Sequence, residues 1–204
     1  MNLIQQFRLE KMAEADFPTR FGHFRVMGFK GHFGDRVEEA AVLVMGPLDG
    51  VPPLVRIHSQ CLTGDVFQSL RCDCRSQLEL SLRMIGEAGR GVLLYEMQEG
   101  RGIGLMNKLR AYALQDEGAD TVEANEQLGF EADLRNYELP GAILRSLGLE
   151  SVRLLSNNPD KIEALERAGV KVAERVPCII PAHESTEDYL RTKKEKMGHL
   201  LDVF

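Results

Sequence analysis

The chain has 204 residues, of which 44% are hydrophobic and 27% charged, a composition typical of soluble globular proteins. Its formal net charge of −6 argues against a general nucleic-acid binder, whose affinity would rest on an excess of Lys and Arg. No apolar run is long enough to span a membrane, and the acidic residues near the N-terminus do not fit a secretory signal, so we expect a cytoplasmic protein without membrane attachment.

The first part of the chain is predicted to form strands. Apolar, often alternating residues occupy 24–29 and 40–45, with turn signals at Gly31, Gly34 and 47–50. These two stretches predict antiparallel strands. A further strand is expected over 53–58, leading directly into the first cysteine.

After this point helical and strand patterns alternate. Helices are predicted over 77–88, 103–117, 133–147, 159–168 and 186–200, where apolar or charged residues recur at helical spacing. Pro140 is expected either to kink the third of these helices or to restart it. Short strands are predicted over 91–95, 151–155 and 170–176.

This order of elements predicts an α/β fold, with N-terminal antiparallel strands followed by alternating helix/strand units around a mixed sheet. No linker separates two parts of the chain, so we expect a single domain over 1–204.

Three of the four cysteines form a cluster with the spacing C-x10-C-x-C, at Cys61, Cys72 and Cys74. Thiolates suit zinc, and a C-x-C pair can place two sulfur atoms on one ion. Three protein ligands would leave a fourth position open for water, whose pKa zinc lowers to about 7. The spacing equally allows a structural site, completed by His58 or by a residue distant in the sequence. Cys178 is predicted to be a small buried apolar side chain.

Two loops between a predicted strand and a predicted helix carry residues suited to an anion. Residues 98–104 (QEGRGIG) contain Arg101, and their glycines let the backbone approach a ligand at a helix N-terminus. Residues 156–159 (SNNP) precede Lys161, a cation in the first helical turn that opposes the helix dipole unless an anion lies between them. A solvated lysine would fit equally well.

Three further side chains have both a functional and an ordinary interpretation. Tyr112 lies four residues after Lys108, so both face the same side of the predicted helix. A half-buried tyrosine with its hydroxyl in water would give the same pattern. Asp133 and Arg135 fit a helix N-cap with a solvated arginine as well as they fit a site.

Several motifs together, in order and spacing, resemble those of the GTP cyclohydrolase II family. The segments are 56–65 (RIHSQCLTGD), 72–74 (CDC), 98–104 (QEGRGIG), 107–112 (NKLRAY), 120–125 (DTVEAN), 128–130 (LGF) with Asp133 and Arg135, and 157–159 (NNP). The resemblance runs from about 55 to 200, and the first fifty residues are less distinctive.

The resemblance implies a reaction, cofactors and an assembly. GTP would be hydrolysed with release of formate from its imidazole ring and of pyrophosphate from its phosphate chain. The product would be 2,5-diamino-6-ribosylamino-4(3H)-pyrimidinone 5′-phosphate, the first intermediate of riboflavin biosynthesis. One zinc per subunit, magnesium on the substrate phosphates and a homodimer are also implied.

The resemblance also implies a role for individual residues. Cys61, Cys72 and Cys74 match the zinc ligands, and Tyr112 matches a tyrosine near the ring chemistry. Asp133 and Arg135 match a base and a nucleophile toward the α-phosphorus. Because a guanidinium stays protonated to a pKa above about 12, a charged Arg135 that stabilises the departing pyrophosphate is an equal alternative. The nucleotide contacts match Arg56, Ile57, His58, Ser59, Gln60, Gln77, Glu99, Gly100, Arg101, Thr121, Ser156 and Lys161.

The chain departs from the family pattern at a few positions. Gln60 stands directly before the first cysteine, where Glu is usual, and this removes a carboxylate beside the site. Arg75-Ser76 stand where a Gly is commoner, and Glu96-Met97 where a basic residue or His is more usual. Ser156 keeps the hydroxyl of the usual Thr. We expect ring opening of GTP, with three alternatives: an altered purine substrate, a reaction that stops at a formamidopyrimidine in another pathway, or a non-catalytic zinc- and nucleotide-binding module.

Overall fold

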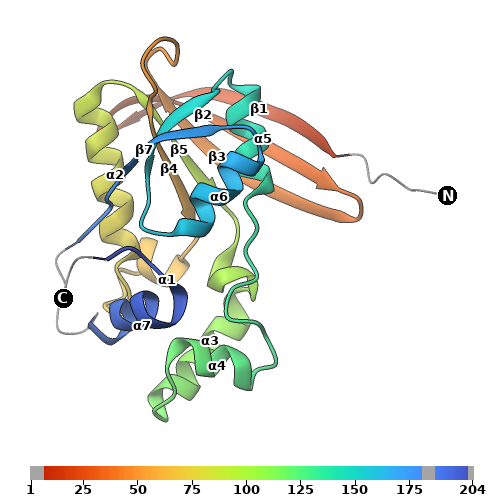
Figure 1. Cartoon of the computed structure of the whole chain (residues 1–204), viewed down its shortest axis with the longest axis vertical. Helices are drawn as coiled ribbons and strands as arrows, with labels where there is room; N and C mark the ends of the chain where they lie inside the picture. Colours follow the sequence, from red (N-terminus) through yellow and green to blue (C-terminus); the bar gives the residue numbers. More distant parts are fainter. Residues whose placement is uncertain (1–6, 181–186, 202–204) are drawn as a thin grey trace.

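A mixed sheet of seven strands forms the centre of the computed structural model, which describes residues 7–180 and 187–201 (Figure 1). The strand order is β1-β2-β3-β5-β4-β6-β7. β1 (Arg8–Thr19), β2 (Gly22–Phe33), β3 (Arg36–Met45) and β5 (Gly91–Glu96) pair antiparallel in that order. β4 (Leu54–Ser59) pairs parallel with β5 and with β6 (Ser151–Leu155), which pairs parallel with β7 (Lys171–Val176). The predicted α/β class with a mixed sheet is confirmed.

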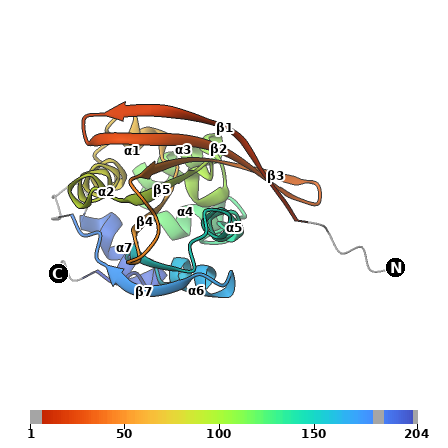
Figure 2. The same ribbon diagram turned by 90° about the horizontal axis from the view of Figure 1, so that it is seen from above.

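The helices cover both faces of this sheet and one of its edges. They are α1 (Leu62–Asp65), α2 (Cys74–Ala88), α3 (Leu105–Asp116), α4 (Thr121–Gln127), α5 (Glu138–Ser146), α6 (Pro159–Arg167) and α7 (Glu187–Met197), together with the 3-10 helix η1 (Glu99–Gly102). α2 lies on one face, and α5 and α6 lie on the other (Figure 2). No helix among the described residues is long and apolar enough to cross a membrane.

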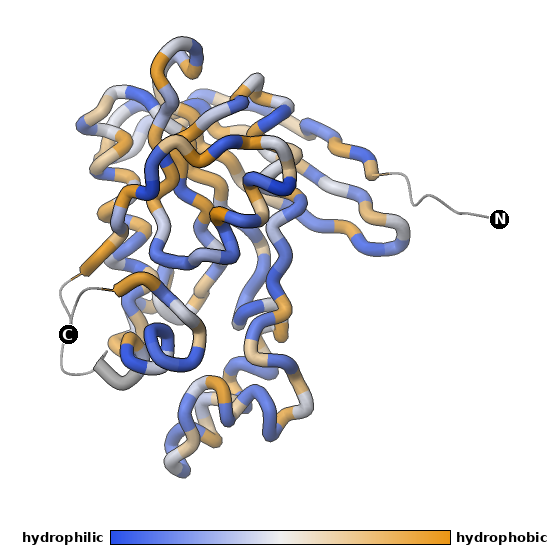
Figure 3. Tube along the Cα trace, in the orientation of Figure 1, coloured by the Kyte–Doolittle hydropathy of each residue, from blue (hydrophilic) through white to orange (hydrophobic). Residues whose placement is uncertain are grey.

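The central strands are apolar on both sides because each face packs against helices. On β4, Val55 and Ile57 pack into the same cluster as Ile143 of α5, whereas Leu54 packs with Ile85 of α2 on the opposite face. This alternation is the two-residue period of a strand. Figure 3 shows apolar residues gathered along the central strands. A strand covered on both faces carries a continuous apolar run, which is why the segment 91–95 was recognisable.

Three expectations for the N-terminal half and the middle of the chain are wrong or incomplete. β1 was not predicted, because it is an edge strand whose residues are mostly exposed. Gly31 does not form a turn but lies inside β2, where an added Cβ would be 2.8 Å from Leu139 Cδ1 of α5. Helix α4 was missed, although Asp120 and Glu123 form a reciprocal capping box at its start.

The helix predicted over 133–147 is shorter than expected. Its first five residues are not helical, and α5 begins at Glu138. The backbone of this segment is bound by the 98–104 loop instead: Leu134 N donates to Arg101 O at 3.0 Å, and Asn136 N donates to Gln98 Oε1 at 3.2 Å. Pro140 falls in the first turn of α5, where no intrahelical N–H bond is lost, so it accompanies the start of the helix. The interpretation of Asp133 as a helix N-cap is therefore wrong.

The remaining predicted elements are found with shifted ends. The terminal helix α7 was expected from residue 186, which lies outside the described residues. The parallel strands β4, β5 and β6 all end at one edge of the sheet, and α1, α3, α4 and α7 gather there (Figure 1). In parallel α/β sheets this edge is the usual place for a ligand.

Candidate metal and nucleotide site

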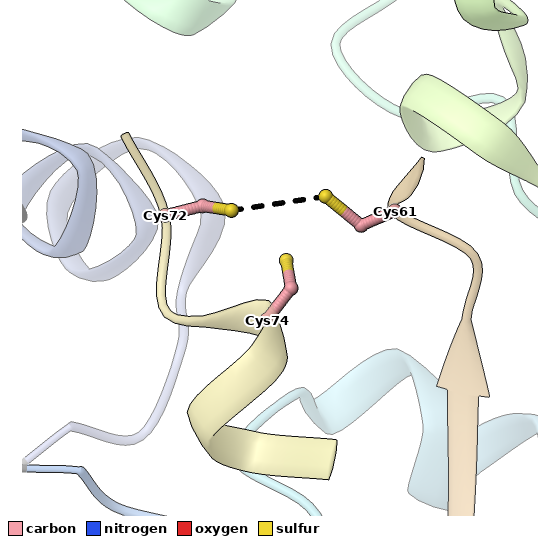
Figure 4. A group of neighbouring side chains, drawn as sticks. All are labelled: Cys61, Cys72 and Cys74. Atoms are coloured by element: carbon pink, nitrogen blue, oxygen red, sulfur yellow. Dashed lines mark hydrogen bonds between the residues drawn. The ribbon is translucent and has the colours of Figure 1, made fainter. Parts of the chain in front are cut away.

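The three clustered cysteines converge at the carboxyl edge of the sheet. Cys61 follows β4, Cys72 lies in the loop before α2, and Cys74 is the first residue of α2. Their sulfur atoms lie within 4.8 Å of one another and point toward a common centre (Figure 4). His58 is not part of this group: among the described residues, the possible metal ligands that come together here are the three cysteines, and His58 Nε2 is instead 3.1 Å from Asp65 Oδ1. The predicted trio is therefore brought together, and the structural alternative completed by His58 is not supported.

The space around the thiols fits a metal ion held by three sulfur ligands. Gly64 of α1 faces the cluster, and a Cβ added to it would be 2.8 Å from Cys72 Sγ and 3.1 Å from Cys61 Sγ. Lys108 Nζ donates to Cys61 Sγ at 3.1 Å, which places a positive charge beside the thiols. Hydrogen bonds from the other two thiols and the charge of Lys108 lower the pKa of Cys61, so a thiolate is favoured here.

Gly64→Ala is expected to weaken zinc binding at least about tenfold, because the new methyl group occupies the space where the sulfur atoms converge. Alanine suits a helix, so the local backbone should tolerate the change. Competition with a chromogenic chelator would measure the zinc affinity. Gly28→Ala is the matched control, since its Cβ would meet only Met12 Cβ, at 3.9 Å. Equal zinc affinity in the two variants would contradict this picture of the cluster.

A buried carboxylate fixes the backbone at the first cysteine. Asp65 accepts hydrogen bonds from Cys61 N at 3.0 Å and from Tyr95 Oη at 2.7 Å. His58, stacked on Tyr95 with 5.4 Å between ring centroids, contacts the same carboxylate. Sequence reasoning did not assign Asp65 a role, because a single Asp in a short helix gives no signal without its distant partners.

Glu99 links the metal cluster to the glycine-rich loop. Its carboxylate accepts from Lys108 Nζ at 2.7 Å and from Leu62 N at 2.7 Å. Burial disfavours the charged ammonium, but Glu99 and the Cys61 sulfur outweigh it and raise the pKa of Lys108. Lys108 therefore stays charged and offsets the negative charge of the Cys61 thiolate.

Tyr112 lies on the side of α3 that faces the cluster, as its spacing from Lys108 predicts. Its hydroxyl is 3.0 Å from Thr63 Oγ1, and Lys108 Nζ lies 5.8 Å from its ring centroid. Burial raises the pKa of Tyr112, so the phenol keeps its proton at neutral pH.

The glycine-rich loop presents an arginine whose two terminal guanidinium nitrogens have no hydrogen-bond partner in the part of the chain that the structure describes. Gly100 and Arg101 both have positive φ, 61° and 57°, so the chain turns tightly within η1. Such a backbone is strained for arginine and persists where surrounding contacts hold it. Both terminal nitrogens of Arg101 are buried and have no hydrogen-bond partner among the described residues. Since buried polar groups are normally paired, this guanidinium is suited to an anionic ligand.

Two more buried basic side chains come from β4 and from the first turn of α6. Arg56 Nη1 donates to Leu155 O at 3.0 Å, and Lys161 Nζ donates to Ile57 O at 2.8 Å. Lys161 is only 5% exposed, so the interpretation as a solvated lysine is wrong. Burial, with Arg56 and Arg135 nearby, lowers the pKa of Lys161. An anion bound beside these cations would restore the charged form.

Asp133 and Arg135 form an ion pair in which the guanidinium contacts both carboxylate oxygens. Arg135 Nε donates to Asp133 Oδ1 at 2.9 Å and to Oδ2 at 3.1 Å. Burial disfavours the charged guanidinium, but Tyr137 and Asp133 raise the pKa of Arg135 above its ordinary value. Burial acts on Asp133 too, but Arg135 outweighs it and lowers the pKa of that carboxyl. Both groups are therefore charged at neutral pH.

One cavity collects nearly all of the predicted residues. The predicted residues that line it are Arg56, His58, Ser59, Gln60, Cys61, Cys72, Cys74, Gln77, Glu99, Gly100, Arg101, Tyr112, Thr121, Arg135, Ser156 and Lys161. Ile57 is fully buried and contributes its carbonyl to Lys161, while Asp133 lies behind Arg135 and lines an adjacent groove. The lining also includes Tyr189, Lys193, Met197 and His199, which sequence reasoning did not single out. The polar, cationic lining suits a phosphate-bearing ligand.

Glu96, one of the departures from the family pattern, is a buried carboxylate beneath this cavity. It is 1% exposed and accepts from Gln98 Nε2 at 3.1 Å and from Ser59 Oγ at 3.4 Å. Burial raises the pKa of Glu96 to about 7, although Lys161 and Arg135 act in the opposite direction. The group therefore exchanges its proton near neutral pH.

Glu96→Gln is expected to remove part of the pH dependence of stability. Between the pKa of an exposed Glu, about 4.3, and the folded value of about 7, the folded protein holds a proton that the unfolded chain has lost. The wild-type free energy of unfolding therefore falls as pH rises through this window and stays lower above it. The fall should be smaller in the variant by on the order of 2–3 kcal/mol.

Denaturant unfolding of the metal-free, reduced protein at pH 5 and pH 8 would measure this difference. Glu87→Gln, an exposed change on α2, should keep the wild-type dependence. The same fall in all three proteins would show that Glu96 does not carry the effect.

Comparison with known proteins agrees with this arrangement. Residues 10–177 match the family model described as GTP cyclohydrolase II. The chain is 53% identical over 195 residues to the GTP cyclohydrolase-2 of Histophilus somni (strain 2336), covering 95% of this chain and 89% of that protein. It is also 53% identical over 200 residues to the GTP cyclohydrolase-2 of Escherichia coli O9:H4 (strain HS), covering 96% and 99%. A solved two-domain 3,4-dihydroxy-2-butanone 4-phosphate synthase from A. baumannii is similar at a TM-score of 0.45 and 19% identity, over 83% of this chain and 40% of that chain. The chain belongs to the GTP cyclohydrolase II family.

Proposed function

We propose that this protein opens the imidazole ring of GTP with release of formate and pyrophosphate, the first step of riboflavin biosynthesis. The product is 2,5-diamino-6-ribosylamino-4(3H)-pyrimidinone 5′-phosphate. The observation that carries the proposal is a single cavity lined both by three converging thiols and by the cations Arg56, Arg101, Arg135 and Lys161. Family membership and the names of the relatives support the same substrate.

Cys61, Cys72 and Cys74 would hold one zinc ion per subunit. Bound there, zinc supplies a Lewis acid that activates water at neutral pH. Lys108 holds the Cys61 sulfur, and Glu99 holds Lys108. Tyr112, whose phenol keeps its proton, is placed beside the cluster to donate a hydrogen bond or a proton to the opening ring.

The phosphate chain would bind among the cations. Arg101 offers two guanidinium nitrogens that have no partner among residues 7–180 and 187–201, and magnesium would arrive with the substrate phosphates. Arg135 stays charged because Asp133 is paired with it, which supports stabilisation of the departing pyrophosphate more than nucleophilic attack. Asp133, with a lowered pKa, is a weak base for removing a proton from Arg135.

An assay of both products tests the proposal. Purified protein, GTP, magnesium and zinc should give formate and pyrophosphate together. Pyrophosphate without formate would mean that the reaction stops before ring opening is complete. If neither formate nor pyrophosphate is released, the assignment as an enzyme is contradicted, and a zinc- and nucleotide-binding module is favoured.

A changed purine preference is the second candidate, and Gln60 favours it. This residue lines the cavity next to Cys61 and is neutral, while the nearby carboxylate of Glu96 is buried below. Comparing GTP with ITP and ATP in the wild type and in Gln60→Glu would test it. A preference that does not change between the two proteins would remove this candidate.

We further propose that the chain forms a single domain over 1–204, acts as a homodimer and works in the cytoplasm. Size-exclusion chromatography with light scattering would test the dimer.

A further inference from the structure

The C-terminal helix α7 forms part of the wall of the substrate cavity. Tyr189, Lys193 and Met197 on this helix and His199 after it line the cavity. These residues follow the segment 10–177 that matches the family model. In Figure 1 α7 lies at the same edge of the sheet as α1, which directly follows Cys61.

Lys193 makes a buried ion pair with the residue between two of the zinc-binding cysteines. Its Nζ lies 2.9 Å from Asp73 Oδ1, and the two side chains are 12% and 5% exposed. The other oxygen of Asp73 accepts a hydrogen bond from Gln77 Nε2 on α2. The carboxylate that separates Cys72 from Cys74 is thus held by α2 on one side and by α7 on the other.

Lys193 is itself held in place by attachments elsewhere on the same segment. Lys196 pairs with Asp120 and with Glu123, the latter at 3.0 Å, and so ties α7 to the start of α4. Leu200 N donates to Asn157 O at 2.8 Å and ties the end of the segment to the loop after β6. Lys193 therefore meets Asp73 from a fixed position.

We propose that Lys193 is a positioning residue for the metal site. Its ion pair with Asp73 holds Cys72 and Cys74 in the orientation in which their sulfur atoms converge with that of Cys61. Without the ammonium, the buried carboxylate of Asp73 has no cation beside it, which is energetically costly. The loop that carries Asp73 then moves so that the carboxylate turns toward water. Both flanking cysteines move with it. The inference rests on the zinc site of the proposed function.

Zinc affinity of the full-length protein tests the inference. Lys193→Gln should weaken zinc binding about tenfold in chelator competition. Loss of a residue that orients a metal ligand without binding the metal usually has an effect of this size. Lys193→Arg, which keeps the charge, should recover most of the affinity. Lys171→Gln is the control, since it removes the charge of an exposed lysine on β7 that does not line the cavity, and it should change the affinity less than twofold.

A double-mutant cycle tests whether Lys193 affects zinc binding through its ion pair with Asp73. In an Asp73→Asn background, Lys193→Gln should add less than a twofold loss, because the pair is already broken. Unchanged zinc affinity in Lys193→Gln would overturn the inference. An equal loss in the Asp73→Asn background would do the same, as would an equal loss in Lys171→Gln. Circular dichroism confirms folding, and Lys193→Met, which keeps the aliphatic stem, replaces the Gln variant if that one unfolds.

Zinc affinity is measured without substrate, so it separates this inference from the reaction. Absence of formate and pyrophosphate from the wild type would contradict the proposed function and leave the zinc measurements unaffected.

Discussion

The Cys72→Ser variant is expected to lose formate release by a factor of about 1000 and to keep its fold. A Lewis acid contributes several kcal/mol to the transition state, and about 4 kcal/mol corresponds to a thousandfold change in rate. A serine hydroxyl is a poor replacement for a soft thiolate ligand. The fold should survive because both apolar clusters of the sheet, around Ile57 and around Ile85, exclude the three cysteines.

Formate assay, zinc content and thermal unfolding of the same preparation would check this expectation. Cys178→Ala is the matched control: Cys178 is fully buried, 3.7 Å from Ser81 Oγ, and outside the cluster. It should lose on the order of 1 kcal/mol of stability and keep both formate release and zinc. If Cys72→Ser unfolds while Cys178→Ala does not, the zinc is structural rather than catalytic.

The parallel half of the sheet was predictable because each strand carries its own signal. β4, β5 and β6 are largely buried, so each is a short segment rich in apolar residues. β1 is an edge strand with exposed residues and gave no such signal. The segment before α5 failed for a different reason: its helical spacing is real, but hydrogen bonds from the 98–101 loop hold its backbone outside the helix. Partners distant in the sequence decide such segments.

The same distinction applies to the site. Motif resemblance named residues on β4 and on the loops and helices that follow β4, β5 and β6, and the sheet brings them to one edge. The residues that were missed act through contacts with partners distant in the sequence, as Asp65 does with Tyr95 and Lys193 with Asp73. A lysine 120 positions beyond its aspartate gives no pattern in one sequence. Supporting residues of this kind become visible only when the chain is folded.

Arg135→Ala is expected to lower pyrophosphate release about 100- to 1000-fold, the usual cost of losing one charged group that stabilises a transition state. Arg135 lines the cavity and is held by two hydrogen bonds from Nε to Asp133. Arg153→Ala is the matched control, because Arg153 is a half-exposed arginine on β6 paired with Glu174 outside the cavity. It should leave pyrophosphate release unchanged.

Arg135→Ala cannot distinguish the two roles of Arg135, because the variant is inactive whether the arginine stabilises charge or acts as a nucleophile. An experiment on the wild-type protein distinguishes them. A nucleophilic arginine must lose a proton to Asp133, and the pair opposes this, since it raises the pKa of Arg135 and lowers that of Asp133. We therefore expect that acid quenching during turnover with GTP labelled at the α-phosphorus traps no label on the protein. A labelled adduct that is absent from Arg135→Ala would establish the nucleophile.

Asp133→Asn separates the two roles further. A charged Arg135 keeps its charge without its partner, so the variant should retain part of its pyrophosphate release, whereas a nucleophile without its base should lose nearly all of it.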